Sequence, residues 1–155
     1  MDEKVIQGLV TLIPHLLSRI TPYLPPEERW RTGGWICVMD TSTDPYGRVV
    51  LHQRIGEVPD DKMAKYKMFA LEKAQRLIRY PDHRTSYQSR NEDAEQYGGA
   101  IRLKECIIAF SGLPERWDEA LVLSAAWLHE LTDATVFHEV RDEVTNCFNL
   151  MTRGR

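Results

Sequence analysis

Two short segments of the sequence could hold a small molecule: the pair Gly98-Gly99 and the acidic pair Asp118-Glu119. Paired glycines before a predicted strand allow unusual backbone angles, which either let another element pack closely or expose N–H groups to a ligand. Asp118 and Glu119 fall near the start of a predicted helix, where the helix dipole alone accounts for negative charge. A carboxylate near a glycine turn can also bind a polar ligand, so both explanations stay open.

The sequence contains only incomplete versions of known catalytic motifs. The segment starting at His129 begins like the zinc motif HExxH, but Asp133 stands where the second histidine belongs. His138 falls about half a turn out of phase with His129 on a continuous helix. Ser111 lacks the GxSxG frame of a nucleophilic serine. We therefore predict no metal site and no serine nucleophile.

The five histidines are the remaining side chains that could bind a metal or a haem iron. His52 lies on a predicted strand and His83 lies in a polar loop, so either could reach a groove beside the sheet. Isolated histidines are more often structural or exposed. Haem is nevertheless a candidate cofactor, with His52 and His83 as the candidate iron ligands.

Composition excludes several classes of partner and site. Cys37, Cys106 and Cys147 are far apart in the chain, so they form neither a CxxC zinc pair nor an even-numbered disulfide framework. The formal net charge of −3 provides no broad field to attract nucleic acid or an anionic membrane. We expect a small-molecule ligand, with no nucleic-acid partner and no membrane partner.

The length of 155 residues predicts a single domain spanning 1–155. The first residues include two acids and a broken apolar pattern, which is not typical of a signal peptide. No apolar run approaches the roughly 18 residues of a membrane-spanning helix. These features together predict a cytoplasmic protein.

Hydrophobic spacing predicts the first elements of the fold. Apolar residues three and four apart indicate an N-terminal helix over about 3–20, which Pro14 should kink or divide. Apolar runs at 35–39 and 48–55 flank a turn-rich stretch and predict a hairpin with a long loop.

A third element, a helix over about 61–80, carries many basic residues. We expect its basic side chains to form a solvated face, although they could also recognise carboxylates such as haem propionates. These side chains are Lys62, Lys65, Lys73, Arg76 and Arg79.

The second half of the chain predicts a further strand pair and helices. The polar segment 82–96 should be a loop with a short strand at about 85–89. Two antiparallel strands follow, over 100–103 and 106–111, and then a helix over about 114–131. A final amphipathic helix over about 133–151 should pack on the core or on another subunit. This order favours an α+β fold with an antiparallel sheet covered by helices.

Several segments of the chain, in order and over about residues 34–130, resemble the GlcG/HbpS-like family. That family is associated with haem binding or degradation and with the C-terminal region of PduO-type proteins. The matching segments are Val38-Met39-Asp40 with the later Arg54, Ala70-Leu71-Glu72-Lys73-Ala74, Thr85-Ser86, Tyr97-Gly98-Gly99-Ala100-Ile101, Phe110-Ser111-Gly112 and Asp118-Glu119.

The resemblance implies a profilin-like fold, an antiparallel sheet flanked by helices, assembled as a homo-oligomer and binding a small molecule such as haem. The implied groove would place Gly98, Gly99, Ser111, Gly112 and Asp118 against the ligand. A ligand carboxylate could pair with the guanidinium group of Arg54 or Arg102. The bulkier run Cys106-Ile107-Ile108-Ala109 replaces smaller residues of the family and predicts a narrowed or altered pocket.

Two other functions remain open on the sequence alone. The chain could be a homo-oligomeric interaction module without ligand chemistry, built on the final helix and on aromatic residues near Tyr23, Trp30 and Trp35. A third interpretation is an enzyme that uses Asp40, His52 or Asp118 as an acid or base.

Overall fold

A computed structural model describes residues 1–132, 135, 137 and 138 of the chain. The predicted helix at about 133–151 falls mostly outside the described residues, as does Cys147. The final helix therefore stays a prediction.

Four antiparallel strands form one sheet in the order β2-β1-β4-β3. They are β1 (Gly33–Asp40), β2 (Arg48–Gly56), β3 (Ala100–Arg102) and β4 (Cys106–Ser111). The two central strands, β1 and β4, are almost wholly buried because helices cover both of their faces. Both predicted strand pairs are confirmed, and they meet in the middle of the sheet where β1 pairs with β4.

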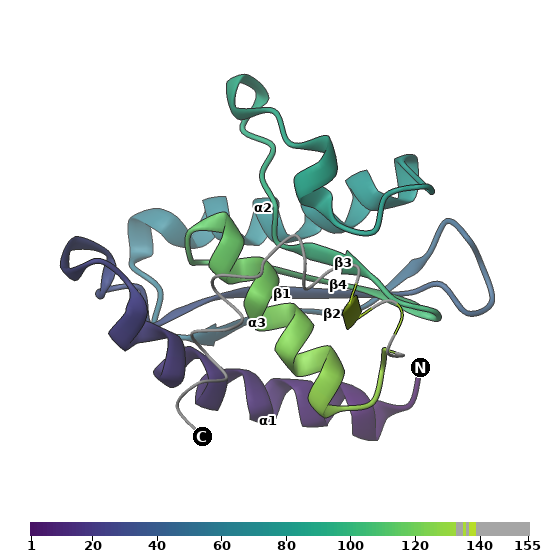
Figure 1. The fold of residues 1–155 in the computed structure, drawn as a ribbon, viewed down its shortest axis with the longest axis horizontal. Coiled ribbons are helices and arrows are strands. Elements are labelled where there is room, and N and C mark those ends of the chain that lie inside the picture. Colours follow the sequence, from purple (N-terminus) through teal and green to yellow (C-terminus); the bar gives the residue numbers. More distant parts are fainter. Residues whose placement is uncertain (133–134, 136, 139–155) are drawn as a thin grey trace.

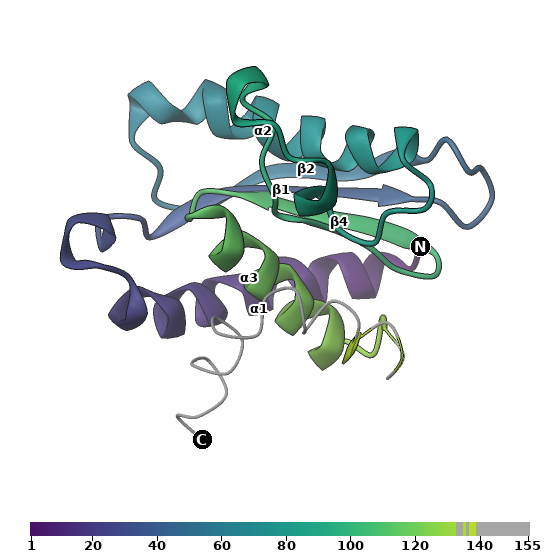
Figure 2. The same ribbon diagram turned by 45° about the horizontal axis from the view of Figure 1, so that its top comes forward.

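Helices lie on both faces of the sheet (Figures 1 and 2). One face packs against α2 (Asp60–Arg79), and the other packs against α1 (Glu3–Ile20) and α3 (Glu115–Leu128). The sheet thus separates two apolar clusters. This arrangement confirms the α+β class, with a profilin-like antiparallel sheet flanked by helices.

The N-terminal helix is continuous through Pro14, so the prediction that this residue could divide it is wrong. Proline removes one backbone N–H donor, but Pro14 lies on the exposed side, where water can solvate the carbonyl that loses its partner. The opposite side buries Leu9, Ile13 and Ile20 completely. Burial of that apolar face outweighs the local cost of the proline.

The segment that joins α2 to β3 contains no regular strand, so the prediction at 85–89 is wrong. Within 85–89, only Thr85 forms an isolated bridge, to Ile101. Residues Ser86–Ser89 instead form a single 3-10 turn, and Gln88 closes a capping box with Thr85. This polar capping offers the backbone an alternative to strand pairing. The segment consequently folds back over the end of α2 and reaches the region of the candidate site.

Candidate functional site

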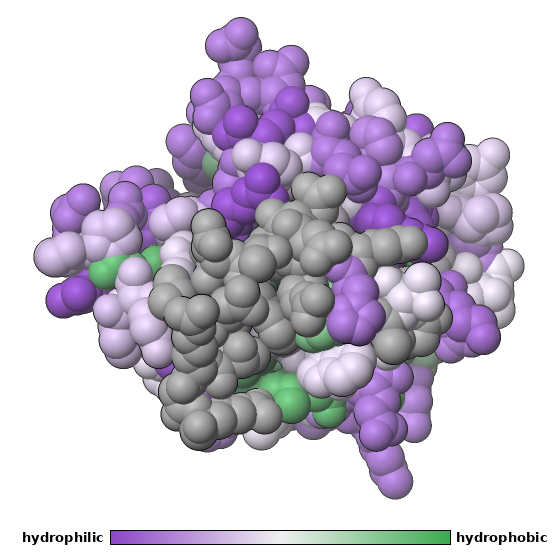
Figure 3. Space-filling view, in the orientation of Figure 1, coloured by the Kyte–Doolittle hydropathy of each residue, from purple (hydrophilic) through white to green (hydrophobic). Residues whose placement is uncertain are grey.

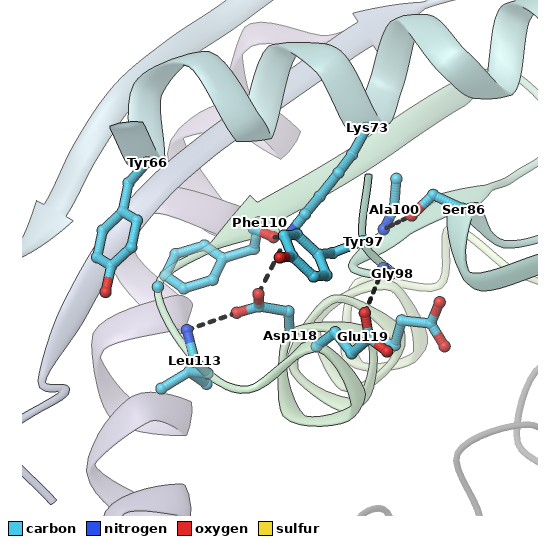
Figure 4. Close-up of polar contacts among 12 residues, drawn as sticks. Tyr66, Lys73, Ser86, Tyr97, Gly98, Ala100, Phe110, Leu113, Asp118 and Glu119 are labelled. Carbon is cyan, nitrogen blue, oxygen red and sulfur yellow. Dashed lines mark hydrogen bonds and ion pairs between the residues drawn. The ribbon is translucent and has the colours of Figure 1, made fainter. Parts of the chain in front are cut away.

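A pocket of about 410 Å³ opens between α2, the loop that precedes β3, and the turn from β4 into α3. Its size falls in the range of small-molecule sites. Figure 4 shows Tyr66 and Lys73 extending from α2, Tyr97 entering from the loop, and Asp118 rising from α3. The lining residues are Arg31, Lys62, Lys65, Tyr66, Phe69, Lys73, Arg90, Glu92, Tyr97, Ser111, Gly112, Leu113, Pro114, Glu115 and Asp118.

The floor of the pocket holds a buried ion pair between Lys73 and Asp118. The Lys73 ammonium donates to the Asp118 carboxylate at 3.1 Å and to the Phe110 carbonyl at 2.9 Å. The other carboxylate oxygen of Asp118 accepts the Leu113 N–H at 2.9 Å. Both charged side chains are only 2% exposed. The pair therefore joins α2, the end of β4 and the start of α3 at one point (Figure 4).

The prediction of a solvated basic face on α2 is wrong for Lys73 and Arg76, which are both buried. Arg76 pairs with Glu72 on its own helix and donates to the Ser86 and Tyr97 carbonyls. Long basic side chains can lay their methylene groups along apolar surface while the charged end finds oxygen acceptors. The helical spacing could have indicated Lys73, because it falls in the same apolar stripe as Ala70 and Leu77.

Burial also controls the ionisation of two neighbouring carboxyl groups on α3. Removal from water raises the pKa of Asp118 to about 6, against the opposing effect of Lys73. Burial likewise raises the pKa of Glu119 to about 7, although the Arg116 guanidinium and backbone hydrogen bonds from Tyr87 and Gly99 lower it. Both carboxyl groups therefore lose their proton at a pH well above the range that is ordinary for carboxyl groups.

Replacing Glu119 with glutamine should make the protein more stable at high pH. In the folded state the pKa of Glu119 is about 7, against an ordinary 4.5, so the folded protein retains a proton that the unfolded chain releases. The stability that this retained proton contributes is fully present below about pH 4.5 and is lost as the pH rises through 7. Glutamine keeps an oxygen that can accept the Tyr87 N–H and cannot ionise.

Urea unfolding of the Glu119→Gln variant from pH 4.5 to pH 8 measures this effect. At the lowest pH, the variant and the parent protein should have nearly the same free energy of unfolding. At the highest pH, the free energy of unfolding of the variant should be larger by an amount of the order of 3 kcal/mol. Glu27→Gln, which changes an exposed carboxyl group, is the matched control and should follow the parent curve. A constant difference between Glu119→Gln and the parent at every pH would contradict the raised pKa.

The two glycines lie behind the floor and do not line the pocket. The Gly98 N–H donates to the Glu115 carboxylate at 3.1 Å. Gly99 has a φ of +130°, and a Cβ there would lie 2.7 Å from the Phe110 carbonyl oxygen and 2.8 Å from the Lys73 nitrogen. Close packing against the floor therefore requires this glycine, whatever the ligand.

Three of the other predicted groove residues do line the pocket: Ser111, Gly112 and Asp118. Ser111 ends β4, and Gly112 begins the turn that follows. The Gly112 carbonyl oxygen accepts a hydrogen bond from the Arg31 guanidinium at 3.1 Å. The structure thus brings together the part of the predicted groove that comes from the β4–α3 junction.

The two predicted carboxylate-binding arginines lie outside the pocket. Arg54 is an exposed residue of the edge strand β2, directly opposite Trp35. Arg102 donates to the His83 carbonyl at 3.0 Å and to the Leu77 carbonyl. It therefore binds the carbonyl end of α2, where a cation is favourable, and holds the following turn in place.

The two predicted haem ligands also lie outside the pocket. The Nε2 atom of His52 is 2.9 Å from the Lys67 carbonyl, and its ring meets Trp35 edge-on. The ring of His83 stacks on Tyr80 with centroids 5.0 Å apart, just after the carboxyl end of α2. Each histidine thus has a structural contact of its own.

The residues that line the pocket are poorly suited to ligate haem iron. None of the described lining residues is a histidine, cysteine or methionine, and only Tyr66 and Tyr97 belong to a type that ligates haem iron. The Tyr66 hydroxyl already accepts the Arg31 guanidinium at 3.0 Å, and burial raises its pKa above the ordinary value. A phenol that resists ionisation is a poor iron ligand.

Several lining residues have no signal in the sequence that marks them as functional. Tyr66 and Phe69 follow the apolar spacing of α2, which equally describes core residues. Arg31 and Arg90 come from loops, whose positions hydrophobic spacing does not reveal. Tyr97 is marked only by its place before the glycine pair.

The three predicted acid-base residues lie in three separate places. The Asp40 carboxylate, at the end of β1, accepts the Met1 amino group at 2.5 Å and the Ser42 hydroxyl at 2.6 Å. These bonds hold the pKa of Asp40 well below its ordinary value. His52 lies on the edge strand and Asp118 lies in the pocket floor, so no pair of them forms a joint acid-base site.

The described cysteines are unreactive. Cys37 and Cys106 are free and buried, and burial raises the pKa of each thiol to about 12. Because the thiolate is the reactive form, neither sulfur is suited to redox or nucleophilic chemistry at neutral pH.

The aromatic residues of the predicted interaction surface do not form one patch. Tyr23 stacks on Trp117 with centroids 6.2 Å apart, whereas Trp30 lies beside Arg31 and Lys62. Trp35 packs against the cluster under α2, on the face of the sheet opposite Trp117. The described residues on the face shown in Figure 3 are mostly hydrophilic. A homo-oligomer stays a prediction.

No protein-family model matches the chain, and no curated protein or solved structure matches it either. The GlcG/HbpS-like resemblance therefore depends on the sequence segments quoted above. Among the described helices, none combines the length and the apolar character needed to cross a bilayer.

Proposed function

We propose that this chain is a GlcG/HbpS-like protein that binds a small organic anion in the pocket between α2 and the β4–α3 turn. The observation that carries the proposal is the set of cationic side chains that line this pocket, of which Lys62 and Lys65 are not held by a buried counter-charge. The buried pair of Lys73 and Asp118 shapes the pocket floor and leaves these outer cations to meet a ligand.

The charges around the pocket favour an anionic ligand. Five cationic side chains line it, against three acidic ones. Lys73 is neutralised by Asp118, and the Arg90 guanidinium lies 2.6 Å from Glu92 and 2.7 Å from Glu115. Of the remaining lysines, Lys62 has no carboxylate partner among the described residues and Lys65 has only an exposed one, so these two can attract a ligand carboxylate.

Titration of the ¹⁵N-labelled protein with sodium benzoate tests the proposal. Benzoate should shift the amide signals of Ser111, Gly112 and Leu113 in a saturable way, because these residues line the pocket. Its uncharged analogue, benzyl alcohol, should bind more weakly, because it lacks the carboxylate. Pocket amides that do not respond to benzoate, acetate or succinate would contradict the proposed function.

Hemin is the second probe, because it is the ligand that the family resemblance implies. We expect no stoichiometric Soret band, since the described lining residues offer no histidine. Replacing His52 and His83 with alanine is the matched control. A Soret band that disappears in this double variant would instead support the histidine-ligated haem predicted from the sequence.

A further inference from the structure

The cations of the pocket differ in how free they are to bind a ligand. Lys73 is bound by Asp118 and by the Phe110 carbonyl, deep in the floor. The Arg31 guanidinium is bound by Glu28 and by the Gly112 carbonyl. These inner groups hold the protein together, so the positive charge that a ligand can use lies elsewhere.

The available charge lies at the mouth, on the N-terminal half of α2. Lys62 pairs with no carboxylate among the described residues, and its ammonium lies 5.7 Å from the Trp30 ring. Lys65 lies 3.5 Å from Glu95, but the two side chains are 51% and 58% exposed. An exposed ion pair of this kind contributes little and exchanges easily. Lys62 and Lys65 are one helical turn apart, so both can reach one anion.

Aromatic rings continue inward from these two lysines. Tyr66 and Phe69 follow on the same face of α2, and Tyr97 meets Phe69 edge-to-face with ring centroids 5.8 Å apart. The Lys65 ammonium lies 5.5 Å from the centre of the Phe69 ring. A cation thus stands directly beside an aromatic wall.

The pocket is large enough for a ring with substituents. An engineered cavity of about 150 Å³ in another protein holds benzene, and this pocket has about 410 Å³. Flat rings pack on aromatic side chains in offset or edge-to-face arrangements, which Phe69 and Tyr97 can both provide.

We infer that the ligand is an aromatic carboxylate, whose carboxylate pairs with Lys62 and Lys65 while its ring packs against Phe69 and Tyr97. This inference rests on the proposed function and specifies its ligand class. The juxtaposition that carries it is a pair of available ammonium groups next to an aromatic wall.

The double variant Lys62→Gln/Lys65→Gln tests the carboxylate contact, with Lys67→Gln as the matched control. Lys67 is an exposed lysine on the same helix, but it lies over Trp35 and does not line the pocket. The double variant should weaken benzoate binding about tenfold. It should leave benzyl alcohol binding unchanged, and Lys67→Gln should change neither.

A second variant, Phe69→Leu, tests the ring contact. It should weaken benzoate about threefold to tenfold, and acetate should bind more weakly than benzoate to the parent protein. Circular dichroism shows whether each variant is folded.

The results separate the two claims. If benzoate binds in the pocket but the lysine variant binds it equally well, the carboxylate contact is wrong. If acetate binds as tightly as benzoate, the aromatic class is wrong although the proposed function stands. If no acid shifts the pocket amides, the proposed function itself fails.

Discussion

Replacing Lys73 with methionine should lower the free energy of unfolding at pH 7 by about 3–5 kcal/mol, because it leaves the buried Asp118 carboxyl group without its counter-charge and the Phe110 carbonyl without its donor. Asp118→Asn should cost less, because the raised pKa of Asp118 means that the fold favours its neutral form, and asparagine can still accept the Leu113 N–H. Urea unfolding at pH 7 measures both losses. The double variant Lys73→Met/Asp118→Asn, which removes both charges, should recover at least half of the loss in Lys73→Met. A loss below about 1 kcal/mol for Lys73→Met would contradict a dry ion pair.

The pH dependence of the loss in Lys73→Met distinguishes the two halves of the pair. This variant leaves Asp118 alone in the floor, and that carboxyl group can escape its buried charge by binding a proton. The pKa of Asp118 is already about 6 with Lys73 in place, and removing the lysine raises it further. The loss in Lys73→Met should therefore shrink as the pH falls from about 7 to about 5, whereas the loss in Asp118→Asn should not shrink.

Replacing Gly99 with alanine should cost more than about 3 kcal/mol, and replacing Gly98 about 1–2 kcal/mol. At Gly99 the φ of +130° disfavours any side chain, and the new Cβ would lie 2.7 Å from the Phe110 carbonyl oxygen, which is fixed in β4. At Gly98 the nearest atoms, at 2.9 Å, belong to the side chains of Glu119 and Tyr87, which can move.

The same urea measurement on the two single alanine variants checks this order. The neighbouring positions serve as controls for each other, since the chemical change is identical. An equal or larger loss in Gly98→Ala would contradict the packing described for Gly99.

Hydrophobic spacing predicted most of the fold, because the buried faces of the helices and strands have regular periods. The spacing of Leu9, Ile13 and Ile20 was enough to predict the helix α1. The burial of these residues outweighs the cost of Pro14 inside the helix. The segment around Thr85 was predicted incorrectly, because its turn is stabilised by side-chain caps and not by an apolar pattern. Local polar contacts of this kind do not recur at regular intervals along the chain, so a search for hydrophobic periodicity does not detect them.

The candidate site was predictable only in part. Asp118, Ser111 and Gly112 come from one short stretch around the β4–α3 turn, so their closeness in sequence carries over into the structure. Lys73 and Arg31 reach the same place through tertiary packing, which the sequence does not reveal. The histidines looked attractive as single residues, yet their partners in the fold are structural.

Stability and binding are separate roles of the same pocket in this account. Lys73, Asp118 and Gly99 build the floor, so their replacement should act mainly on unfolding. At the mouth Lys65 is exposed and Lys62 is half-buried, so their replacement should act on ligand affinity while the protein stays folded. This division allows the ligand contacts to be tested in folded variants.

A crystal structure of the protein with 4-bromobenzoate would test the central claim most directly, because the anomalous signal of bromine locates the ligand without prior assumptions. We predict a bromine peak inside the pocket between α2 and the β4–α3 turn, beside Phe69 and Tyr97, with the carboxylate toward Lys62 and Lys65. An empty pocket, or a bromine peak only at some other surface of the protein, would contradict the account.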